Sequence, residues 1–424
     1  MNERTFVLKG TICYSNSLTE LSITENGYLV CEDGRCAGVF DELPEKFAGI
    51  SCTDFGDELI IPGLTDLHLH APQYTFRASG MDLELLDWLN TYTFPQEARY
   101  EDTEFAKEAY SIFTEDMKKS PNTRACIFGT LHVPATEILM EQLDKTGIKA
   151  MVGKVNMDRN GSPQLQEESA QASADATVQW IKDTLDKFEN VKPILTPRFT
   201  PSCSDALMEK LSEIQKKYHL PMQSHLSENF SEIAWVKELC PNTHFYGEAY
   251  SQFDLFGGDC PTIMAHCVHS SDEEIALMKK QGVYIAHCPQ SNTNLASGIS
   301  PVRRYLDEGL HIGLGSDIAG GTSVSILRAM ADAIQVSKLY WRLVDSSMKP
   351  LTVEEAFYMG TGGGSFFGKV GSFKEGYEFD AVVLNDSTIP TPLKLSPKDR
   401  LERLIYLSDD RNITAKYVAG RKIL

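Results

Sequence analysis

The chain has 424 residues, of which 59 are acidic and 40 are basic, so its formal charge at pH 7 is −19. This acidic excess argues against nucleic acids and anionic membranes as partners, because both are bound by clustered positive charge. Hydrophobic residues make up 42% and charged residues 23%, as in globular proteins with a large core. No apolar run reaches the ~20 residues of a membrane span, and the start lacks the basic and then apolar pattern of a secretory signal. We therefore expect a cytoplasmic protein whose ten cysteines are free thiols.

The two ends of the chain favour short strands, at residues 5–7 and 27–31 and again at residues 380–384 and 415–418. Between them, apolar segments recur, and each is followed by a helical pattern of polar and apolar residues. These segments are residues 59–70, 125–131, 150–155, 193–199, 221–225, 262–266, 283–287 and 311–315. Eight such units over about 300 residues predict an α/β fold with a closed parallel (β/α)8 barrel rather than an open sheet.

A His-x-His pair, His68 and His70, ends the first of these apolar segments. On a strand, side chains two residues apart point to the same face, so both imidazoles can bind one ion. Ten histidines in 424 residues would give about 0.2 such pairs by chance, so the pair alone is a weak signal. One packed and one exposed histidine is an equally good interpretation until other residues support a site.

Four further polar residues lie where later apolar segments end. They are His225, His266, His287 and Asp317. In a parallel barrel the carboxyl ends of all strands meet at one face, which is where barrel active sites are built. A packed core histidine is the ordinary interpretation of any one of them, but five placements together favour a site. Imidazoles with a carboxylate suit zinc in near-tetrahedral geometry.

Glu228 follows His225 by three residues, and a loop turning over the barrel mouth would bring its carboxylate beside the proposed metal. A metal-activated water needs a group that takes its proton and passes it on. Alternatively, Glu228 is an acidic residue at the N-terminus of a helix, where the helix dipole favours negative charge. Both interpretations can hold.

These residues carry a resemblance to the amidohydrolase superfamily. Pro62-Gly63-Leu64 leading into His68 and His70, together with His225, His266 and Asp317, is similar to the superfamily pattern. The similarity covers essentially the whole chain and is strongest to members that deaminate guanine. It includes residues 65–74, 82–88, 92–95, 196–199, 223–229, 286–289, 313–321 and 371–380.

The resemblance implies a TIM-like barrel of residues 63–370, and a small β-sandwich built from residues 1–62 and 371–424. It also implies one Zn²⁺ per subunit, held by His68, His70, His225 and Asp317. Two-metal relatives use a carboxylated lysine at the end of the fourth strand, where this chain has Arg198. Lys154, one strand earlier, is interpreted as structural or as a residue that contacts the metal ligands.

The implied reaction is hydrolytic deamination of guanine to xanthine and ammonia, with Glu228 moving the proton, His266 holding the attacking oxygen and Asp317 assisting the leaving group. The residues expected to contact guanine are Gln73, Arg198, Phe199, His225, Glu228 and Asp317. Arg198 offers a fixed fork of donors to the oxo group, and Gln73 can both donate and accept at the ring edge. Phe199 or Phe76 could cover the ring face. The alternative for Arg198 is a purely structural pair with an acidic neighbour.

Two other functions remain open from the sequence. One is a zinc aminohydrolase for another purine, a pterin or a triazine, because its metal site would be the same. The other is a non-catalytic scaffold, which the filled ligand and proton-shuttle positions disfavour. The resemblance further implies a homodimer with a small-molecule substrate, whereas the sequence by itself assigns no role to His287.

Overall fold

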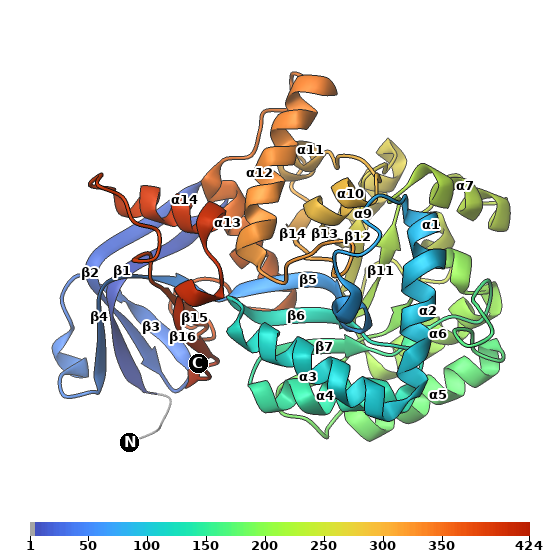
Figure 1. The fold of residues 1–424 in the computed structure, drawn as a ribbon, viewed down its shortest axis with the longest axis horizontal. Helices are drawn as coiled ribbons and strands as arrows, with labels where there is room; N and C mark the ends of the chain where they lie inside the picture. The colour runs from blue at the N-terminus through green and yellow to red at the C-terminus, as the bar shows by residue number, and fades with distance from the viewer. Residues whose placement is uncertain (1–4) are drawn as a thin grey trace.

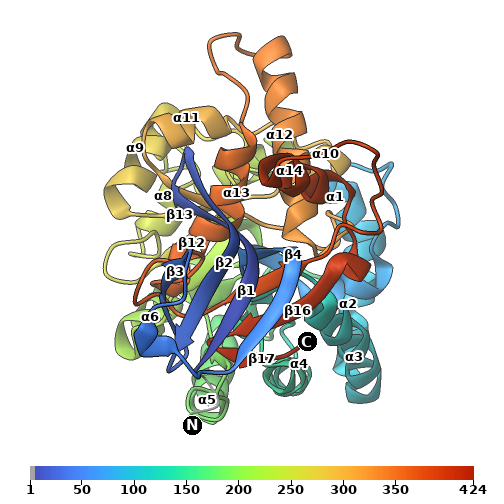
Figure 2. The same cartoon turned by 90° about the vertical axis from the view of Figure 1, so that its left-hand side faces the viewer.

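The computed structural model describes residues 5–424, so the first four residues of the predicted N-terminal β-segment lie outside the described residues. Strands from both ends of the chain lie together at one side of the molecule, and the central part of the chain forms a larger α/β region beside them (Figure 1). Figure 2 views the molecule from the side of these terminal strands. The site discussed below belongs to the α/β region.

The terminal strands form one seven-stranded sheet in the order β17-β16-β15-β4-β1-β2-β3. Their bounds are β1 (Phe6–Ser17), β2 (Glu20–Glu32), β3 (Arg35–Phe40), β4 (Cys52–Pro62), β15 (Ala381–Leu384), β16 (Ile413–Val418) and β17 (Arg421–Lys422). Strand β4 joins the two ends of the chain, because it pairs in parallel with β1 and antiparallel with β15.

The α/β region contains parallel strands only among its described ladders, in the orders β5-β6-β7-β9, β10-β8 and β11-β12-β13-β14. Their bounds are β5 (Leu64–His70), β6 (Asn122–Phe128), β7 (Lys149–Gly153), β8 (Val155–Asn156), β9 (Val191–Pro193), β10 (Thr196–Pro197), β11 (Met222–Leu226), β12 (Thr262–His266), β13 (Tyr284–His287) and β14 (His311–Leu314). Apolar side chains from several of these strands, including Leu67, Cys126, Ile263 and Ala286, pack into one buried cluster.

Helices connect and cover these strands (Figure 1). The α-helices are α1 (Leu85–Trp88), α2 (Phe94–Glu97), α3 (Thr103–Lys119), α4 (Val133–Thr146), α5 (Ala170–Thr184), α6 (Asp205–Tyr218), α7 (Phe230–Leu239), α8 (Glu248–Ser251), α9 (Asp272–Gln281), α10 (Pro289–Asn294), α11 (Val302–Asp307), α12 (Ile326–Leu343), α13 (Val353–Gly362) and α14 (Pro397–Leu407). A π-helical turn, η3 (Leu89–Thr93), and 3₁₀ turns η1 (Glu45–Phe47), η2 (Ala71–Phe76), η4 (Ala98–Glu101), η5 (Thr200–Ser202), η6 (Gly363–Phe367) and η7 (Asp410–Asn412) complete the elements. Within residues 5–424, no helix combines the length and apolarity that a membrane crossing requires.

The first predicted strand, residues 59–70, is two strands in the structure. Strand β4 ends at Pro62 in the seven-stranded sheet, and β5 begins at Leu64 in the α/β region. Gly63 lies between them, and a Cβ atom there would be 2.2 Å from the hydroxyl oxygen of Thr123. The close approach of Gly63 to Thr123 of β6 therefore requires glycine at this position.

Lys416 of β16 joins the terminal sheet to the α/β region. Its side chain is fully buried, and its Nζ donates hydrogen bonds to the carbonyl oxygens of Met117, Ser120 and Asn122 at 3.1, 2.8 and 3.1 Å. These carbonyls lie at the end of α3 and the start of β6, where a cation is favoured by the helix dipole. One side chain thus satisfies the polar groups of the corner that precedes β6.

We expect Lys416→Met to lower the free energy of unfolding by about 1–3 kcal/mol, because three buried carbonyls lose this donor, although the Met117 carbonyl still accepts from the N–H and Oγ of Ser120. Urea unfolding followed by circular dichroism measures this loss. Lys422→Met is the matched control, since Lys422 is exposed on neighbouring β17 and should change stability by less than about 0.5 kcal/mol. Equal effects of the two variants would contradict the role of Lys416.

The same residue predicts a pH dependence of stability. Burial lowers the pKa of Lys416 from 10.5 to about 7. Between these values the unfolded chain binds more protons at this site than the native chain, so the contribution of Lys416 to the free energy of unfolding rises with pH. We expect the stability difference between the wild type and Lys416→Met to grow from pH 7 to pH 9.

Candidate active site

Four predicted metal ligands converge where the parallel strands end. His68 and His70 end β5, His225 lies in β11, and Asp317 follows β14. The Nε2 atoms of His70 and His225 are 3.2 Å apart, and Asp317 Oδ1 lies 3.2 Å from His68 Nε2 and 3.5 Å from His70 Nε2. Four candidate donor atoms from three separate parts of the chain therefore face a common point.

Backbone contacts fix this arrangement. The carboxylate of buried Asp66 accepts hydrogen bonds from the backbone N–H groups of His68 and Ser316, at 3.2 and 3.0 Å. The N–H of Asp317 donates to the carbonyl of His68 at 2.8 Å. The first strand and the segment after the last strand are therefore held together at the position where their ligands meet.

The donor set fits a tetrahedral zinc ion. With metal–ligand distances of 2.0–2.1 Å, neighbouring donors lie about 3.3 Å apart. The three separations given above, of 3.2, 3.2 and 3.5 Å, are close to this value. Both ring nitrogens of His68 are buried and form no hydrogen bond among the described residues. Burial lowers the pKa values of His70 and His225 well below 6.5, which keeps these imidazoles in the neutral form that binds metals.

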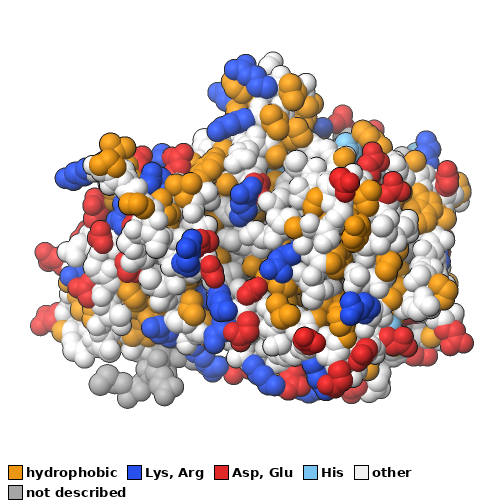
Figure 3. All heavy atoms as spheres, in the orientation of Figure 1, with side chains coloured by type: hydrophobic (Ala, Val, Ile, Leu, Met, Phe, Trp, Pro, Cys, Tyr) orange, Lys and Arg blue, Asp and Glu red, His pale blue; other side chains and the backbone are white. Residues whose placement is uncertain are grey.

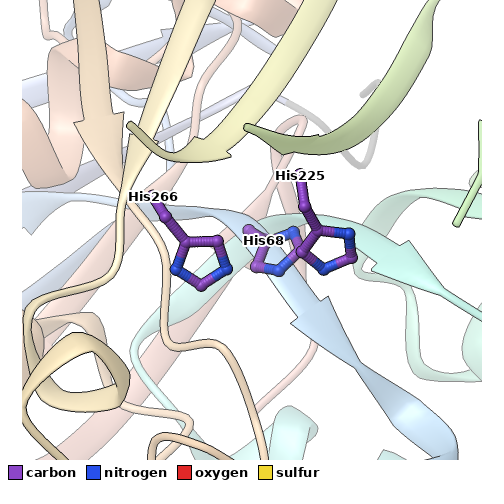
Figure 4. A group of neighbouring side chains, drawn as sticks. All are labelled: His68, His225 and His266. Carbon is purple, nitrogen blue, oxygen red and sulfur yellow. The ribbon is translucent and has the colours of Figure 1, made fainter. Parts of the chain in front are cut away.

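His266 and Glu228 lie beside this cluster. The rings of His68, His225 and His266 lie next to one another, with centroid distances of 4.9, 5.4 and 5.6 Å (Figure 4). His266 Nε2 is 3.4 Å from Glu228 Oε2 and 3.8 Å from Asp317 Oδ2, while its Nδ1 lies 2.8 Å from Asn292 Oδ1. Since Asn292 Oδ1 can only accept, Nδ1 carries the proton and Nε2 faces the two carboxylates.

Glu228 is held on both sides. Its Oε1 accepts a hydrogen bond from Ser297 Oγ at 2.9 Å, and its backbone N–H donates to Glu232 Oε2 at 3.0 Å. Burial raises the pKa of Glu228, and burial together with the Glu228 charge raises the pKa of Glu232 to about 7. Two neighbouring carboxyl groups thus hold protons more readily than exposed ones, which suits general acid–base chemistry.

A cavity enclosing about 450 Å³ opens onto these groups. It is lined by His70, Gln73, Leu85, Trp88, Leu89, Arg198, Phe199, His225, Glu228, Glu232, His266, Leu295, Asp317 and Gly320. The lining is apolar on the side of α1 and polar around the metal-type ligands. Such a mixture suits a flat, polar ring compound.

Arg198 and Gln73 line the end of the cavity that carries the predicted substrate contacts, and both bind Glu97, which lies outside the lining. Arg198 donates from Nη1 and Nη2 to the two carboxylate oxygens of Glu97, at 2.5 and 3.2 Å. Gln73 Nε2 donates to Glu97 Oε1 at 2.8 Å, and Gln73 Oε1 accepts from the N–H of Ala319 at 2.9 Å. The acidic neighbour considered for Arg198 is therefore present, while Arg198 itself still lines the cavity.

Some residues singled out from the sequence lie elsewhere. Phe76 packs on Trp88 at 5.8 Å between ring centroids and is not part of the cavity lining. His287 is buried, and neither ring nitrogen has a hydrogen-bond partner among the described residues; burial lowers its pKa to about 3. Lys154 is buried in an ion pair with Glu167.

The sequence did not indicate Trp88 and Glu232, which line the cavity, or Glu97, which binds the lining residues Arg198 and Gln73. Trp88 lies within a segment that carries the family resemblance, but no periodicity indicates that its side chain enters the site. Glu232 lies four residues after Glu228, one helical turn, and this spacing was the available signal.

Comparison with known proteins agrees with this geometry. Residues 59–423 match the Amidohydrolase family. The chain belongs to the amidohydrolase family. Members of this family are metal-dependent hydrolases, so this amidohydrolase is a hydrolytic enzyme. Solved relatives of the same architecture imply that its parallel strands form a TIM-like barrel.

Relatives of this amidohydrolase share most of its length. It is 39% identical to a guanine deaminase of Dictyostelium discoideum, with 98% of each chain covered. It is 41% identical to a guanine deaminase of Mus musculus, covering 87% of this chain and 83% of the relative. A crystal structure of guanine deaminase from C. acetobutylicum with guanine bound in its active site aligns with a TM-score of 0.96 at 49% identity, covering 99% of this chain and 100% of the other.

We expect this amidohydrolase to be stabilised by Zn²⁺. At free zinc 100-fold above the dissociation constant, binding adds about 2.7 kcal/mol to the free energy of unfolding. Thermal unfolding of chelator-treated protein, with and without added Zn²⁺, together with metal analysis, measures the effect. His68→Ala should abolish the response, whereas His244→Ala, on an exposed side chain, should preserve it. An unchanged response in His68→Ala would refute the ligand assignment.

Proposed function

We propose that this amidohydrolase converts guanine and water to xanthine and ammonia, with one Zn²⁺ per subunit. The observation that carries the proposal is that one cavity is lined by three of the proposed ligands, by the Glu228 carboxylate and by the donor fork of Arg198. The fourth proposed ligand, His68, lies 3.2 Å from Asp317. The identity and near-complete coverage of relatives named guanine deaminase, one of them solved with guanine, support the choice of substrate.

His68, His70, His225 and Asp317 would hold the zinc ion. When bound, the ion acts as a Lewis acid that makes water acidic enough to react at neutral pH. Among the described residues, the possible ligand groups at this point include His68 with His70 and Asp317, and His68 with His225 and His266.

The residues beside the ligands carry the proton transfers. Glu228 takes a proton from the attacking water and delivers it to the ring nitrogen next to the amino-bearing carbon. The raised pKa of this buried carboxyl suits both steps. His266, 3.4 Å from Glu228, holds the attacking oxygen, and Asp317 assists proton transfer to the amine that leaves as ammonia.

Substrate binding falls to Gln73, Arg198, Phe199, His225, Glu228 and Asp317, all of which line the cavity. Arg198 uses two of its five N–H donors on Glu97, so three remain for the oxo group and neighbouring ring nitrogen. Phe199 supplies part of the apolar wall beside the ring, and its own ring lies 6.4 Å from that of His225.

Steady-state assays with guanine, adenine, cytosine and 8-oxoguanine test the proposed substrate. Guanine should give the highest kcat/KM, with release of one ammonia per xanthine formed. A higher kcat/KM for any other compound in the panel would identify that compound as the substrate. No ammonia from guanine in zinc-loaded protein would overturn the proposal.

For the architecture we propose a closed (β/α)8 barrel of residues 63–370, flanked by a β-sandwich domain of residues 1–62 and 371–424. The backbone hydrogen bonds between Asp317 and His68, and between His70 and Ile318, support closure between the last and first strands. Arg124 of β6 pairs with Asp380 at 2.6 Å and with Glu378 at 2.7 Å, which supports a fixed contact between the two domains.

We also propose a cytoplasmic homodimer. Leu339, Leu343 and Val344 are exposed where α12 ends, and Figure 3 shows hydrophobic side chains on this protruding end of the molecule. Exposed apolar side chains grouped in this way favour a protein contact. Light scattering after size exclusion should give about twice the 47.2 kDa chain mass, and Leu343→Lys should shift the equilibrium towards monomer. A monomeric wild-type protein at micromolar concentration would contradict the dimer.

A further inference from the structure

Glu97 forms no part of the metal or proton-transfer groups and does not line the cavity, yet it binds Arg198 and Gln73, which do. It is the last residue of α2, within residues 85–101, a segment that also supplies Leu85, Trp88 and Leu89 to the cavity lining. Its side chain is only 3% exposed. A buried carboxylate is costly unless its oxygens are satisfied, so its partners define its role.

The partners of Glu97 are the two side chains that are predicted to bind the polar edge of the substrate. Arg198, after β10, donates to both carboxylate oxygens, and Gln73, after β5, donates to Oε1. These two residues lie 101 and 24 positions from Glu97 in the sequence. One carboxylate therefore connects donors from three separate segments.

This connection fixes which atoms face the substrate. A glutamine amide can turn over and exchange its donor and acceptor, but Glu97 accepts only, and the N–H of Ala319 donates to the other end of the Gln73 amide. The guanidinium is fixed by its two bonds to Glu97, and by the ring of Phe94, whose centroid is 5.0 Å from Arg198 Cζ. Both Phe94 and Glu97 belong to α2, so this short helix sets the orientation of the guanidinium.

Glu97 also sets the charge of this end of the cavity. Without its carboxylate, the buried guanidinium of Arg198 would be an uncompensated cation that attracts anionic rings. With it, the pair is neutral overall and retains N–H donors on the guanidinium. Such an environment favours a neutral base with a carbonyl group over an anionic one.

We propose that Glu97 is the positioning residue that sets substrate selectivity: it orients Arg198 and Gln73 towards the oxo-bearing edge of the purine and excludes anionic purines by neutralising Arg198. The inference rests on the proposed function, since it assumes a purine substrate. It goes further by assigning selectivity to a residue that does not itself need to touch the ring.

The test compares zinc-loaded wild type with Glu97→Gln and Glu97→Asp. Three quantities are measured: kcat and KM for guanine, and the inhibition constants of 2-aminopurine and of urate in competition with guanine. The first inhibitor lacks the 6-oxo group, and the second is a purine monoanion at neutral pH. Glu101→Gln, an exposed carboxylate in neighbouring η4, is the matched control.

For Glu97→Gln we expect kcat/KM for guanine to fall about 100-fold, chiefly through KM, because the donors that bind the oxo group lose their orientation. The inhibition constant of 2-aminopurine should change by less than about threefold, and that of urate should fall about tenfold, because the guanidinium charge is uncovered. Glu97→Asp retains the charge but moves the carboxylate by about one methylene. It should therefore lower kcat/KM for guanine without lowering the inhibition constant of urate.

Equal losses for guanine and 2-aminopurine, or unchanged urate inhibition in Glu97→Gln, would overturn the proposal and leave Glu97 a structural residue. If Glu97→Gln does not fold, Glu97→Asp decides: the proposal requires a larger loss for guanine than for 2-aminopurine, and equal losses overturn it. Absence of guanine turnover in the wild type is a different result, because it removes the proposed function rather than the role of Glu97.

Discussion

Glu228→Gln should retain its metal and its fold but lose about 10²–10⁴-fold in kcat, because glutamine cannot take the proton from the attacking water. The substitution preserves the local contacts. A glutamine oxygen can still accept from Ser297 Oγ, and its amide can donate to His266 Nε2, which lies 3.4 Å from the present carboxylate oxygen. Single-turnover and steady-state assays with guanine, alongside zinc analysis, measure the loss.

Glu238→Gln is the matched control for this variant, since Glu238 is exposed on α7 and should leave activity unchanged. Wild-type turnover in Glu228→Gln would remove Glu228 from the proton pathway. Loss of zinc in this variant would instead show that the carboxylate supports the metal site.

Arg198→Leu should lower guanine kcat/KM by about 10⁴-fold, since a site built to hydrogen-bond a polar group rejects a partner that cannot complete the bonds. Zinc content should not change, because Arg198 contacts the ligands only through its backbone carbonyl, which lies 2.6 Å from His225 Nδ1. The quantity to measure is kcat/KM for guanine relative to adenine. Retention of the wild-type ratio would show that Arg198 does not read the oxo group.

Arg198→Leu leaves Glu97 buried without a cationic partner, so Arg198→Lys provides a second variant. Lysine keeps the charge beside Glu97 but lacks the planar fork, and we expect it to lose most of the guanine activity while folding normally. Arg411→Leu, at an exposed arginine, controls for loss of positive charge. Full activity of Arg198→Lys would show that charge alone is sufficient.

The ligand positions could be predicted because they follow two simple rules. His68 and His70 share a face through the two-residue period of a strand, and His225 and Asp317 follow from the common edge at which parallel strands end. The structure brings donor atoms of these side chains to 3.2–3.5 Å from one another in three pairs, and their role as ligands stays a prediction.

The substrate end of the cavity could be predicted only in part. Gln73 and Arg198 follow directly after strands, and they were found through the resemblance. Glu97 lies on a short helix between a π-helical turn and a 3₁₀ turn, where neither a two-residue nor a 3.6-residue period applies. Only tertiary folding brings Glu97 to its two partners. The sequence left Phe76 open as a neighbour of the substrate ring, because its position also depends on tertiary folding.

The buried ammonium group of Lys416 bears on how the chain folds during synthesis. It contacts carbonyls almost 300 positions earlier. The carbonyl oxygens of the corner before β6 therefore lack this donor until residue 416 has left the ribosome. Contacts of such long sequence separation form late and slow folding. Loss of the last ten residues would remove Lys416 with β17 and expose this corner to water. A nascent or C-terminally clipped chain should therefore be a preferred target of proteases, even though every residue of its active site has already been made.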